Sequence, residues 1–544
     1  MPAALTYVDE LRAAARHLGR RRFLTTTGAA AALAFAVNLP AAGALAAAEL
    51  DPRRITSDPF TLGVASGDPL PESVLLWTRL APRPYEPSGG LPTGLRVAVV
   101  WELAQDERFT RGVRRGTVTA HPEFAHTVRV EVGGLAPGSG WFYRFRAGSW
   151  VSRVGRTRTA PAPGARNTRL KLAAVSCQAY PDGYFTAHRH LAREDLDVVF
   201  HLGDYIYEYP IDSTAADRHY KPGTIPAVFN RETFTLDDYR LRYALYKSDP
   251  DLIAAHAAHP FVVTWDDHEA EDNYAGAVSQ ENVPPEEFLI RRAAAYRAYW
   301  ENQPLRVPQQ PTGPDMRLYR RLSFGTLAQF DILDTRQYRS DQAYGDGWQS
   351  PGPLIDDPRR TLTGAAQERW LIDGWRHSRA RWNVVPQQVM FAERRTLPTA
   401  NYKLNMDGWD GYRASRQRIL AGAAATGIQN LLVLTGDVHV AFACDIKADF
   451  RDRASRTVGS EIVTTSISSG RDGADKPGNH ATLLQANPHM KFYNGRRGYV
   501  TVTLAPDSAR ADFRTVSAVT TPGAPVRTAA SFVTRAGRPG LIPA

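Results

Sequence analysis

The pattern of apolar and polar residues divides the chain into two parts. Between residues 51 and 163 the apolar residues form short runs separated by turn residues. The clearest runs are residues 74–78, 96–101, 127–132 and 141–145. In the third run Val128, Val130 and Val132 alternate with polar residues, which is typical of a strand with one buried face. No helical periodicity interrupts these runs, so we predict a small all-β domain, an antiparallel sandwich of immunoglobulin or fibronectin type.

The pattern changes after a linker rich in proline and alanine at residues 159–166. From there, short apolar runs alternate with segments of helical periodicity. The apolar runs are residues 170–175, 196–200, 260–264, 330–333, 383–385 and 431–435, and the helical segments are residues 236–246, 286–300 and 364–371. Strands that alternate with helices are typical of buried sheets covered by helices. We predict an α/β domain over residues 167–525, followed by a C-terminal tail at residues 526–544.

The first 48 residues are predicted to be an export signal that is not part of the fold. Arg20 and Arg21 precede an apolar run at residues 28–39, and residues 46–48 are alanines that suit a cleavage site. The alternatives are a membrane anchor and a buried helix, but the run is shorter than the roughly 20 residues that span a membrane. This signal predicts export through the twin-arginine translocase and a secreted or periplasmic mature protein.

Composition limits the partners that the protein can have. The chain has 544 residues, a formal net charge of +10 and two cysteines. Two cysteines cannot form a disulfide framework, and no run of basic residues interleaved with aromatic residues supports nucleic-acid binding. We therefore expect no nucleic acid as a specific partner, a weak attraction for anionic substrates at most, and a monomer.

Residues that can bind metal ions follow four of the predicted strands. Cys177, Asp204 and Asp267 each come after a separate apolar run, and Asp437 and His439 come after the last one. Buried parallel strands bring their carboxyl ends to the same edge of a sheet. Taken singly, these residues have structural explanations such as a buried thiol, a helix cap or a core histidine. Together they favour a metal site, because burying several ionisable groups without a cation costs several kcal/mol for each group.

The ligand types point to two different cations. A thiolate from Cys177, a phenolate from Tyr207 and an imidazole from His439 suit a transition metal, and the first two favour iron(III) over zinc or magnesium. The other candidates offer hard oxygen atoms, which suit Ca²⁺, Mg²⁺ or Mn²⁺. They are Asp204, Asp267, Asp437 and the amide oxygen of Asn273. Asp204 is the candidate bridge because it has two oxygens to share, and two neighbouring metals suit displacement at phosphorus.

The order of these residues resembles that of the calcineurin-like metallophosphoesterases. The chain has Gly-Asp-x-x-Tyr at residues 203–207, Asp-Asp-His-Glu at residues 266–269 and Gly-Asp-x-His at residues 436–439. It departs from the usual signatures at Cys177, Asp267 and Asp437, which stand in place of an Asp, an Asn and a His. Those departures match the PhoD-like alkaline phosphatase/phosphodiesterase family. Further agreement lies at residues 60–69, 243–250, 333–339 and 409–412.

The resemblance implies a fold and a set of residue roles. The fold would be a metallophosphoesterase-like sandwich of mixed β-sheets flanked by helices, with the β domain packed outside it. His268 would contact the phosphate and protonate the leaving alkoxide. The implied ligands of Fe(III) are Cys177, Asp204, Tyr207 and His439; those of Ca(II) are Asp204, Asp437 and either Asp267 or Asn273. Mn, Zn or Mg are alternatives to these two metals.

Other candidate residues have less specific patterns. Arg336 and Arg339 follow a strand end and suit bidentate phosphate binding, although arginines are common on surfaces. Trp409, Asp410 and Tyr412 either shape the pocket or pack as a turn. Cys444 is expected to be a buried free thiol. Three long connections are expected to wall the site. They are residues 208–235, 338–360 and 470–495.

We expect an exported alkaline phosphatase or phosphodiesterase that hydrolyses phosphate mono- or diesters with a metal-activated hydroxide at an iron-calcium site. The closest alternative is a phospholipase D-type phosphodiesterase that acts on phospholipid or wall-polymer head groups, in contact with a membrane or the cell wall. The alternative from another class is a non-catalytic extracellular protein that binds metal or phosphate. Turnover that a chelator abolishes and Ca²⁺ restores would separate the enzyme from the binding protein.

Overall fold

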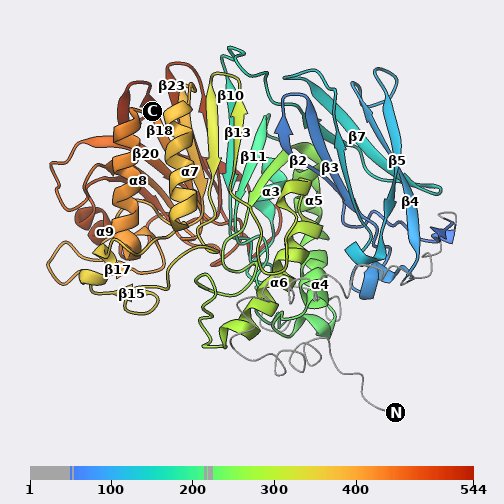
Figure 1. Ribbon diagram of the computed structural model, residues 1–544, viewed down its shortest axis with the longest axis horizontal. Helices are drawn as coiled ribbons and strands as arrows, with labels where there is room; N and C mark the ends of the chain where they lie inside the picture. The colour runs from blue at the N-terminus through green and yellow to red at the C-terminus, as the bar shows by residue number, and fades with distance from the viewer. Residues whose placement is uncertain (1–48, 52–53, 93, 213–216, 219–224) are drawn as a thin grey trace.

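Two large mixed β-sheets form the centre of the computed structural model (Figure 1). The structure describes residues 49–51, 54–92, 94–212, 217–218 and 225–544. The predicted export signal, residues 1–48, therefore lies outside the described residues. Within the described ranges, no helix is both long enough and apolar enough to cross a membrane.

The first sheet has ten strands, with a parallel centre and antiparallel edges. Its order is β25 (Arg538–Pro543), β24 (Val526–Arg535), β23 (Ser508–Val516), β22 (Gly498–Leu504), β10 (Leu170–Val175), β11 (Val198–Leu202), β12 (Pro260–Thr264), β2 (Val64–Leu70), β3 (Ser73–Arg79) and β6 (Thr127–Val132). β10, β11, β12 and β2 are parallel neighbours. Every residue of β11 and β12 is buried, which explains why these strands are continuous apolar runs in the sequence.

The second sheet has seven strands and is also parallel at its centre. Its order is β13 (Arg320–Phe324), β14 (Ala328–Ile332), β16 (Trp382–Gln387), β18 (Leu431–Thr435), β20 (Thr457–Val463), β19 (Ala441–Lys447) and β21 (Met490–Asn494). β14, β16, β18 and β20 are parallel to one another. The predicted strands at residues 330–333, 383–385 and 431–435 are therefore present.

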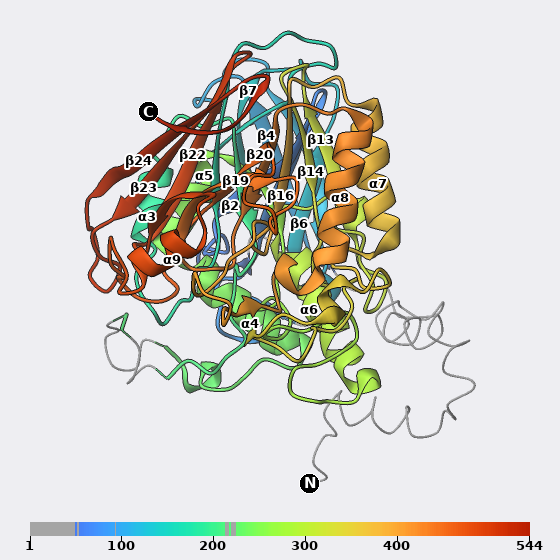
Figure 2. The ribbon, with the colours of Figure 1, turned by 90° about the vertical axis from the view of Figure 1, so that its left-hand side faces the viewer.

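Helices cover the outer faces of both sheets. They are α3 (Thr186–Leu191), α4 (Leu236–Lys247), α5 (Pro250–Ala258), α6 (Pro285–Asn302), α7 (Gly364–His377), α8 (Arg413–Thr426) and α9 (His480–Ala486). Figure 2 shows α7 and α8 side by side along one outer face. The two sheets pack on each other through residues such as Phe200 and Phe330, whose ring centroids are 4.7 Å apart. The predicted α/β sandwich flanked by helices is confirmed.

The N-terminal strands also form a sandwich, but one of its two sheets is part of the ten-stranded sheet. The other sheet contains β1 (Glu49–Leu50), β4 (Arg96–Ala104), β5 (Arg114–Ala120), β7 (Gly140–Ala147), β8 (Trp150–Val151) and β9 (Gly155–Arg158). Val74, Val99 and Phe145 belong to the core that joins the two sheets. β2 of this sandwich pairs with β12 of the central sheet through backbone hydrogen bonds. The expectation that the β domain packs outside the central sheets is therefore wrong.

The prediction of a C-terminal tail at residues 526–544 is wrong. These residues form β24 and β25 at the edge of the ten-stranded sheet, and Phe532 and Leu541 are buried in the core between the two sheets. The remaining positions of β24 are mostly Ala, Ser, Thr and Arg, and many are partly exposed. The sequence therefore lacks the apolar run that marks the central strands. The segment 470–495, expected to be a long loop, likewise contains α9 and β21.

Candidate metal centre and active site

The strands of the two sheets bring the predicted ligands to one edge. Cys177 follows β10, Asp204 follows β11, Asp267 follows β12, and Asp437 follows β18 of the second sheet. Ser176 forms a parallel bridge with Ser466, which joins the two sheets beside these residues. The convergence that the sequence predicted is therefore present.

Several of the candidate ligands have an unusual backbone conformation. Cys177, Asp204, Asn273, Asp437 and His439 have φ angles of 58°, 55°, 50°, 64° and 56°. This left-handed region is uncommon for residues other than glycine, and such residues gather at functional sites where the surrounding structure holds them in place. The fold therefore holds these five residues in a conformation that they rarely adopt on their own.

The turn that carries Asp204 is fixed by a glycine and a glutamate. Gly203 has φ 106°, and a Cβ atom there would lie 2.4 Å from Cβ of Asp266, so no larger residue fits. The buried carboxylate of Glu269 accepts hydrogen bonds from the backbone N–H groups of Tyr205 (2.6 Å), Asp266 (2.8 Å) and Asp204 (3.1 Å). Glu269 thus connects the ends of β11 and β12 and positions both acidic turns.

The four predicted iron ligands lie together. Cys177, Asp204 and His439 each offer one ligand atom, and these atoms lie within 4.8 Å of one another. The hydroxyl of Tyr207 donates to Oδ2 of Asp204 at 2.9 Å, and it lies 3.0 Å from Nε2 of His439. Ser469 donates a further hydrogen bond to the same hydroxyl at 2.8 Å. All four side chains can therefore reach one cation.

A cation suits the electrostatics of this cluster. Burial, followed by the nearby Asp204 carboxylate, raises the pKa values of both Cys177 and Tyr207 well above their ordinary range. Oδ1 of Asp204 is buried and has no hydrogen-bond partner among the described residues. Buried carboxylate oxygens without donors are costly unless a cation compensates them. The donor set therefore fits a bound metal.

A second group of acidic residues adjoins the first. Asp204, Asp267 and His268 form one set of ligand atoms within 4.8 Å, and Asp266, Asp267 and Asp437 form another. Asp204 therefore belongs to the groups on both sides, as a bridging carboxylate must. Asn273 donates its backbone N–H to Asp267 at 2.7 Å and its side-chain N–H to Asp346 at 2.7 Å. No described residue donates a hydrogen bond to its amide oxygen, which can therefore coordinate a cation.

His268 stands beside Tyr207 and is held by an acidic partner. Its Nδ1 atom lies 2.8 Å from Oε2 of Glu208, and its ring centroid lies 4.2 Å from that of Tyr207. Burial alone would lower the pKa of His268, but the carboxylates of Glu208, Asp267 and Asp204 outweigh it and raise the pKa well above its ordinary value. Glu208, which is not among the predicted metal ligands, therefore favours a protonated imidazole.

The predicted phosphate-binding arginines are completely buried in ion pairs. Arg336 pairs with Asp266 and donates to Oδ1 of Asp407 at 2.8 Å, and its guanidinium also lies 3.3 Å from Asp267. Arg339 donates to the backbone oxygen of Asp407 at 2.7 Å. Neither arginine is among the residues that line the pocket described below. In this arrangement the guanidinium groups of Arg336 and Arg339 offset the negative charge of the carboxylates without lining the pocket.

The cation sites open into a pocket of about 260 Å³. Its wall contains His268, His439, Asn273 and Arg394. Its acidic residues are Asp204, Asp267, Asp272, Asp346, Asp407 and Asp437. Asp346 comes from the loop 338–360, as expected, whereas no described residue of 208–235 or 470–495 lines the pocket. No sequence pattern points to Asp346, Arg394 or Asp407, because they follow none of the predicted strands and belong to none of the motifs.

The remaining sequence candidates have structural roles. Trp409 is buried in a 3₁₀ turn, Trp409–Tyr412, where its indole N–H donates to Gln387 at 3.0 Å. The hydroxyl of Tyr412 donates to the backbone oxygen of Ser340 at 2.7 Å. These residues pack as a turn and do not line the pocket. Neither Cys177 nor Cys444 is in a disulfide, and Cys444 is a buried free thiol, as expected.

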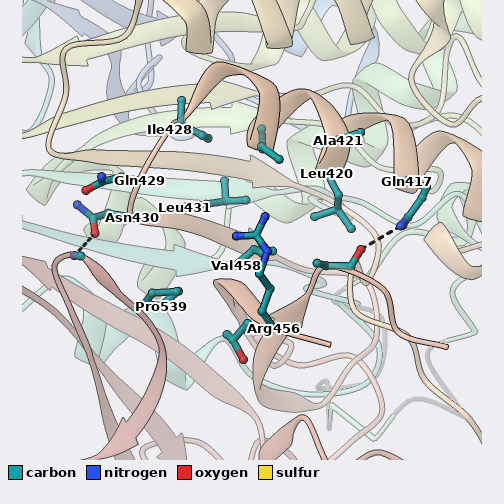
Figure 3. A pocket seen from close by; sticks show the side chains of 15 residues that line it. Gln417, Leu420, Ala421, Ile428, Gln429, Asn430, Leu431, Arg456, Val458 and Pro539 are labelled. Atoms are coloured by element: carbon teal, nitrogen blue, oxygen red, sulfur yellow. Dashed lines mark hydrogen bonds between the residues drawn. The ribbon is translucent and has the colours of Figure 1, made fainter. Parts of the chain in front are cut away.

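A second hollow, of about 340 Å³, lies at the opposite end of the seven-stranded sheet (Figure 3). Leu431, the first residue of β18, lies in its wall with Leu420 and Val458, whereas Asp437 follows the other end of β18. The described residues that line it include no Asp, Glu, His or Cys. The chemistry therefore belongs to the smaller, acidic pocket.

A sandwich of two mixed sheets, with clustered acidic and histidine side chains at one strand edge, is the arrangement of a metallophosphoesterase. A family model described as PhoD-like phosphatase matches residues 172–513, and one described as PhoD-like phosphatase, N-terminal domain, matches residues 44–161. The chain belongs to the PhoD-like phosphatase family. The predicted family and the predicted enzyme class, a phosphoric ester hydrolase, are confirmed.

Two relatives cover nearly the whole chain. Alkaline phosphatase D of Bacillus subtilis (strain 168) is 47% identical over 523 residues, which are 96% of this chain and 88% of the relative. A solved structure titled "Structure of PhoD" is 48% identical and superposes with a TM-score of 0.86. The match covers 90% of this chain and 93% of that structure. The similarity thus includes the N-terminal sandwich as well as the central sheets.

Proposed function

We propose that the protein is an exported hydrolase of phosphate mono- and diesters that works with Fe(III) and Ca(II). The observation that carries this proposal is the shared position of Asp204, which lies in the Cys177–His439 group of ligand atoms and in the group that contains Asp267. Membership of the PhoD-like phosphatase family, which implies ester hydrolysis, supports the same conclusion. The alkaline phosphatase activity named for the Bacillus relative supports it further.

In this proposal two metals divide the ligands by chemical type. The thiolate of Cys177, the phenolate of Tyr207 and the imidazole of His439 would hold Fe(III), since thiolate and imidazole donors suit transition metals. Asp437 and either Asp267 or Asn273 would hold Ca(II) through their oxygens. Asp204 has one hydrogen-bonded oxygen and one buried oxygen without a partner among the described residues, so it can bind both cations. Mn, Zn and Mg are the alternatives to test at both positions.

The protein side chains bind and orient the ester and supply a proton. When bound, the cations polarise the phosphoryl oxygens and activate water. The imidazolium of His268 gives its proton to the leaving alkoxide as the phosphorus–oxygen ester bond breaks. Glu208 keeps the His268 ring oriented by accepting from Nδ1. Arg336 offsets the charge of Asp266 and Asp407, so that the acidic turns can be buried.

The proposal includes an export route and two substrate classes, between which an experiment must decide. Arg20 and Arg21 direct the chain to the twin-arginine translocase, and the mature monomer acts outside the cytoplasm. Phosphomonoesters and small diesters are the proposed substrates. Phospholipid or wall-polymer head groups are the alternative, which requires contact with a membrane or the cell wall.

The decisive experiment uses the protein exported by its own signal. We expect an aryl phosphate and a bis-aryl phosphate to be hydrolysed, with phosphatidylcholine as the test of the alternative, and we expect a chelator to abolish turnover and Ca²⁺ to restore it. Asp204→Asn should lose both metals and all activity, whereas Asp195→Asn, at an exposed position, should lose neither. Absence of turnover with iron and calcium supplied would favour a non-catalytic metal-binding protein.

A further inference from the structure

The arginines expected to hold the phosphate are buried in ion pairs, so the pocket needs another group to bind the ester. Arg336 and Arg339 pair with Asp407 and do not line the pocket. Arg394 is the one arginine among the described residues of its wall.

Arg394 differs from its neighbours in having a guanidinium free of acidic partners. Arg395 pairs with Glu393 at 2.6 Å, and Arg416 pairs with Asp410 at 2.7 Å. In the described part of the chain no carboxylate oxygen lies within 4.0 Å of the Arg394 guanidinium. Its backbone N–H is anchored, because it donates to Oδ2 of Asp410 at 2.9 Å. The residue is thus fixed at its backbone with its donors available.

An aromatic side chain holds the guanidinium at the pocket. Cζ of Arg394 lies 4.6 Å from the ring centroid of Trp348 and 5.9 Å from that of Phe442. Trp348 belongs to β15 (Trp348–Gln349), which pairs with β17 (Leu404–Asn405) at the lower left of Figure 1. Gly347 and Asn405, one on each of these connected segments, line the pocket. Stacking on a tryptophan limits the side chain to few orientations and leaves the in-plane N–H donors available.

An arginine in this state is suited to a phosphate group. The planar fork of N–H donors matches two oxygens of a phosphate, and charge-assisted bonds of this kind are stronger than neutral ones. At neutral pH a phosphomonoester carries between one and two negative charges, whereas a phosphodiester carries one. A cation that contacts the non-bridging oxygens therefore gains more from a monoester than from a diester.

We propose that Arg394, held by Trp348, binds the non-bridging oxygens of the ester phosphate and sets a preference for monoesters over diesters. This inference rests on the proposed function, because it places the residue at the substrate of the same pocket. It assigns specificity to the wall formed by β15 and β17, which the sequence motifs do not include.

The test compares Arg394→Gln with the wild type, each as the complete mature protein with its metals bound. The value of kcat/KM for an aryl phosphate should fall by about 10- to 100-fold, and that for a bis-aryl phosphate by less than about 3-fold. The inhibition constant of inorganic phosphate should rise about 10-fold. Arg394→Lys, which keeps the charge but loses the fork, should recover part of the monoester activity.

Arg456→Gln is the matched control. It removes the same charge from an exposed arginine that lines the second hollow, as Figure 3 shows. This variant should behave as the wild type on both esters. Trp348→Leu should raise KM for the monoester more than it lowers kcat, because it frees the guanidinium without removing it. Elemental analysis should give the same metal content in all variants.

Two results would overturn the inference. One is an equal loss, or no loss, on both esters in Arg394→Gln with metal content unchanged. The other is an unchanged affinity for inorganic phosphate, measured by calorimetry on the calcium-loaded protein. The second measurement needs no turnover, so it decides the role of Arg394 even if the wild type hydrolyses neither ester, in which case only the proposed function fails.

Discussion

The Nδ1 atom of His268 lies 2.8 Å from Oε2 of Glu208, whose side chain is 1% exposed. The other oxygen of Glu208 accepts the backbone N–H of Asp272 at 2.7 Å, so the carboxylate cannot rotate without losing a bond. A buried carboxylate in this position fixes the orientation of the imidazole and stabilises its protonated form. Glu208 is therefore a positioning residue for the acid that the proposed reaction needs.

Replacing Glu208 with Gln should affect esters with poor leaving groups most. An alkoxide needs a proton as it departs, whereas a nitrophenolate does not. We expect kcat for alkyl phosphates to fall about 10- to 100-fold and kcat for nitrophenyl phosphate to change by less than about 3-fold. Steady-state kinetics over a series of leaving groups measures this difference. An equal loss across the series, with metals retained, would count against the role of Glu208.

Cys177→Ala should separate the two metal sites. The thiolate is proposed to bind iron alone, so the variant should retain less than about a tenth of the wild-type iron while part of the calcium remains. Elemental analysis of the exported protein measures both metals. Cys444→Ala is the control, since Cys444 is equally buried but lies among apolar residues of the other sheet. Iron retained in Cys177→Ala would refute the thiolate as a ligand.

Tyr207→Phe should abolish a visible absorption band. A phenolate bound to iron(III) gives a charge-transfer transition, and phenylalanine has the same shape without the oxygen. We expect the wild type to be coloured and the variant to lose the band, as measured by absorption spectroscopy at equal iron content. Tyr205→Phe is the control because the Tyr205 hydroxyl bonds to His256 at 2.8 Å, outside the ligand cluster. A colourless wild type that contains iron would contradict the phenolate assignment.

The sequence could predict the ligands that follow central strands, because those strands are apolar on both faces. β11 and β12 are completely buried, so each is a clear run that ends at an acidic turn. The topology of parallel sheets then places Asp204 and Asp267 at one edge. For Asp204 and Asp267 the local sequence pattern and the position in the fold therefore agree, and both residues belong to the family motifs.

Residues whose position depends on tertiary pairing could not be predicted in this way. Arg336 follows a strand, as a phosphate-binding arginine would, but its partner Asp407 is distant in sequence and only the fold shows that the two are paired. Glu208 and Arg394 lie on irregular segments with no periodic pattern. The sequence does not indicate β24 because its outer positions are polar, and edge pairing to β23 defines this strand in place of an apolar run.

The stability of the fold should decrease in mild acid because of buried histidines such as His259. Its ring is completely buried, and its Nε2 donates to the backbone oxygen of Leu191 at 3.0 Å. Burial lowers the pKa of His259 to about 4. The ordinary value is about 6.5, so the unfolded chain takes up a proton at a higher pH than the folded chain. This group therefore does not reduce the free energy of unfolding above about pH 6.5. As the pH falls from 6.5 towards 4, protonation of the unfolded chain reduces the free energy of unfolding by about 3 kcal/mol in total.

Replacing His259 with Gln should remove this contribution, since the amide can still donate to Leu191 but does not titrate. Between pH 7.5 and pH 5 the decrease in Tm should be about 2 °C smaller in His259→Gln than in the wild type. Thermal unfolding followed by circular dichroism at the two pH values measures the difference. His377→Gln, at an exposed position on α7, should leave the pH dependence unchanged. If His259→Gln has the same acid sensitivity as the wild type, the buried imidazole is not a source of it, and other buried groups must account for the loss of stability.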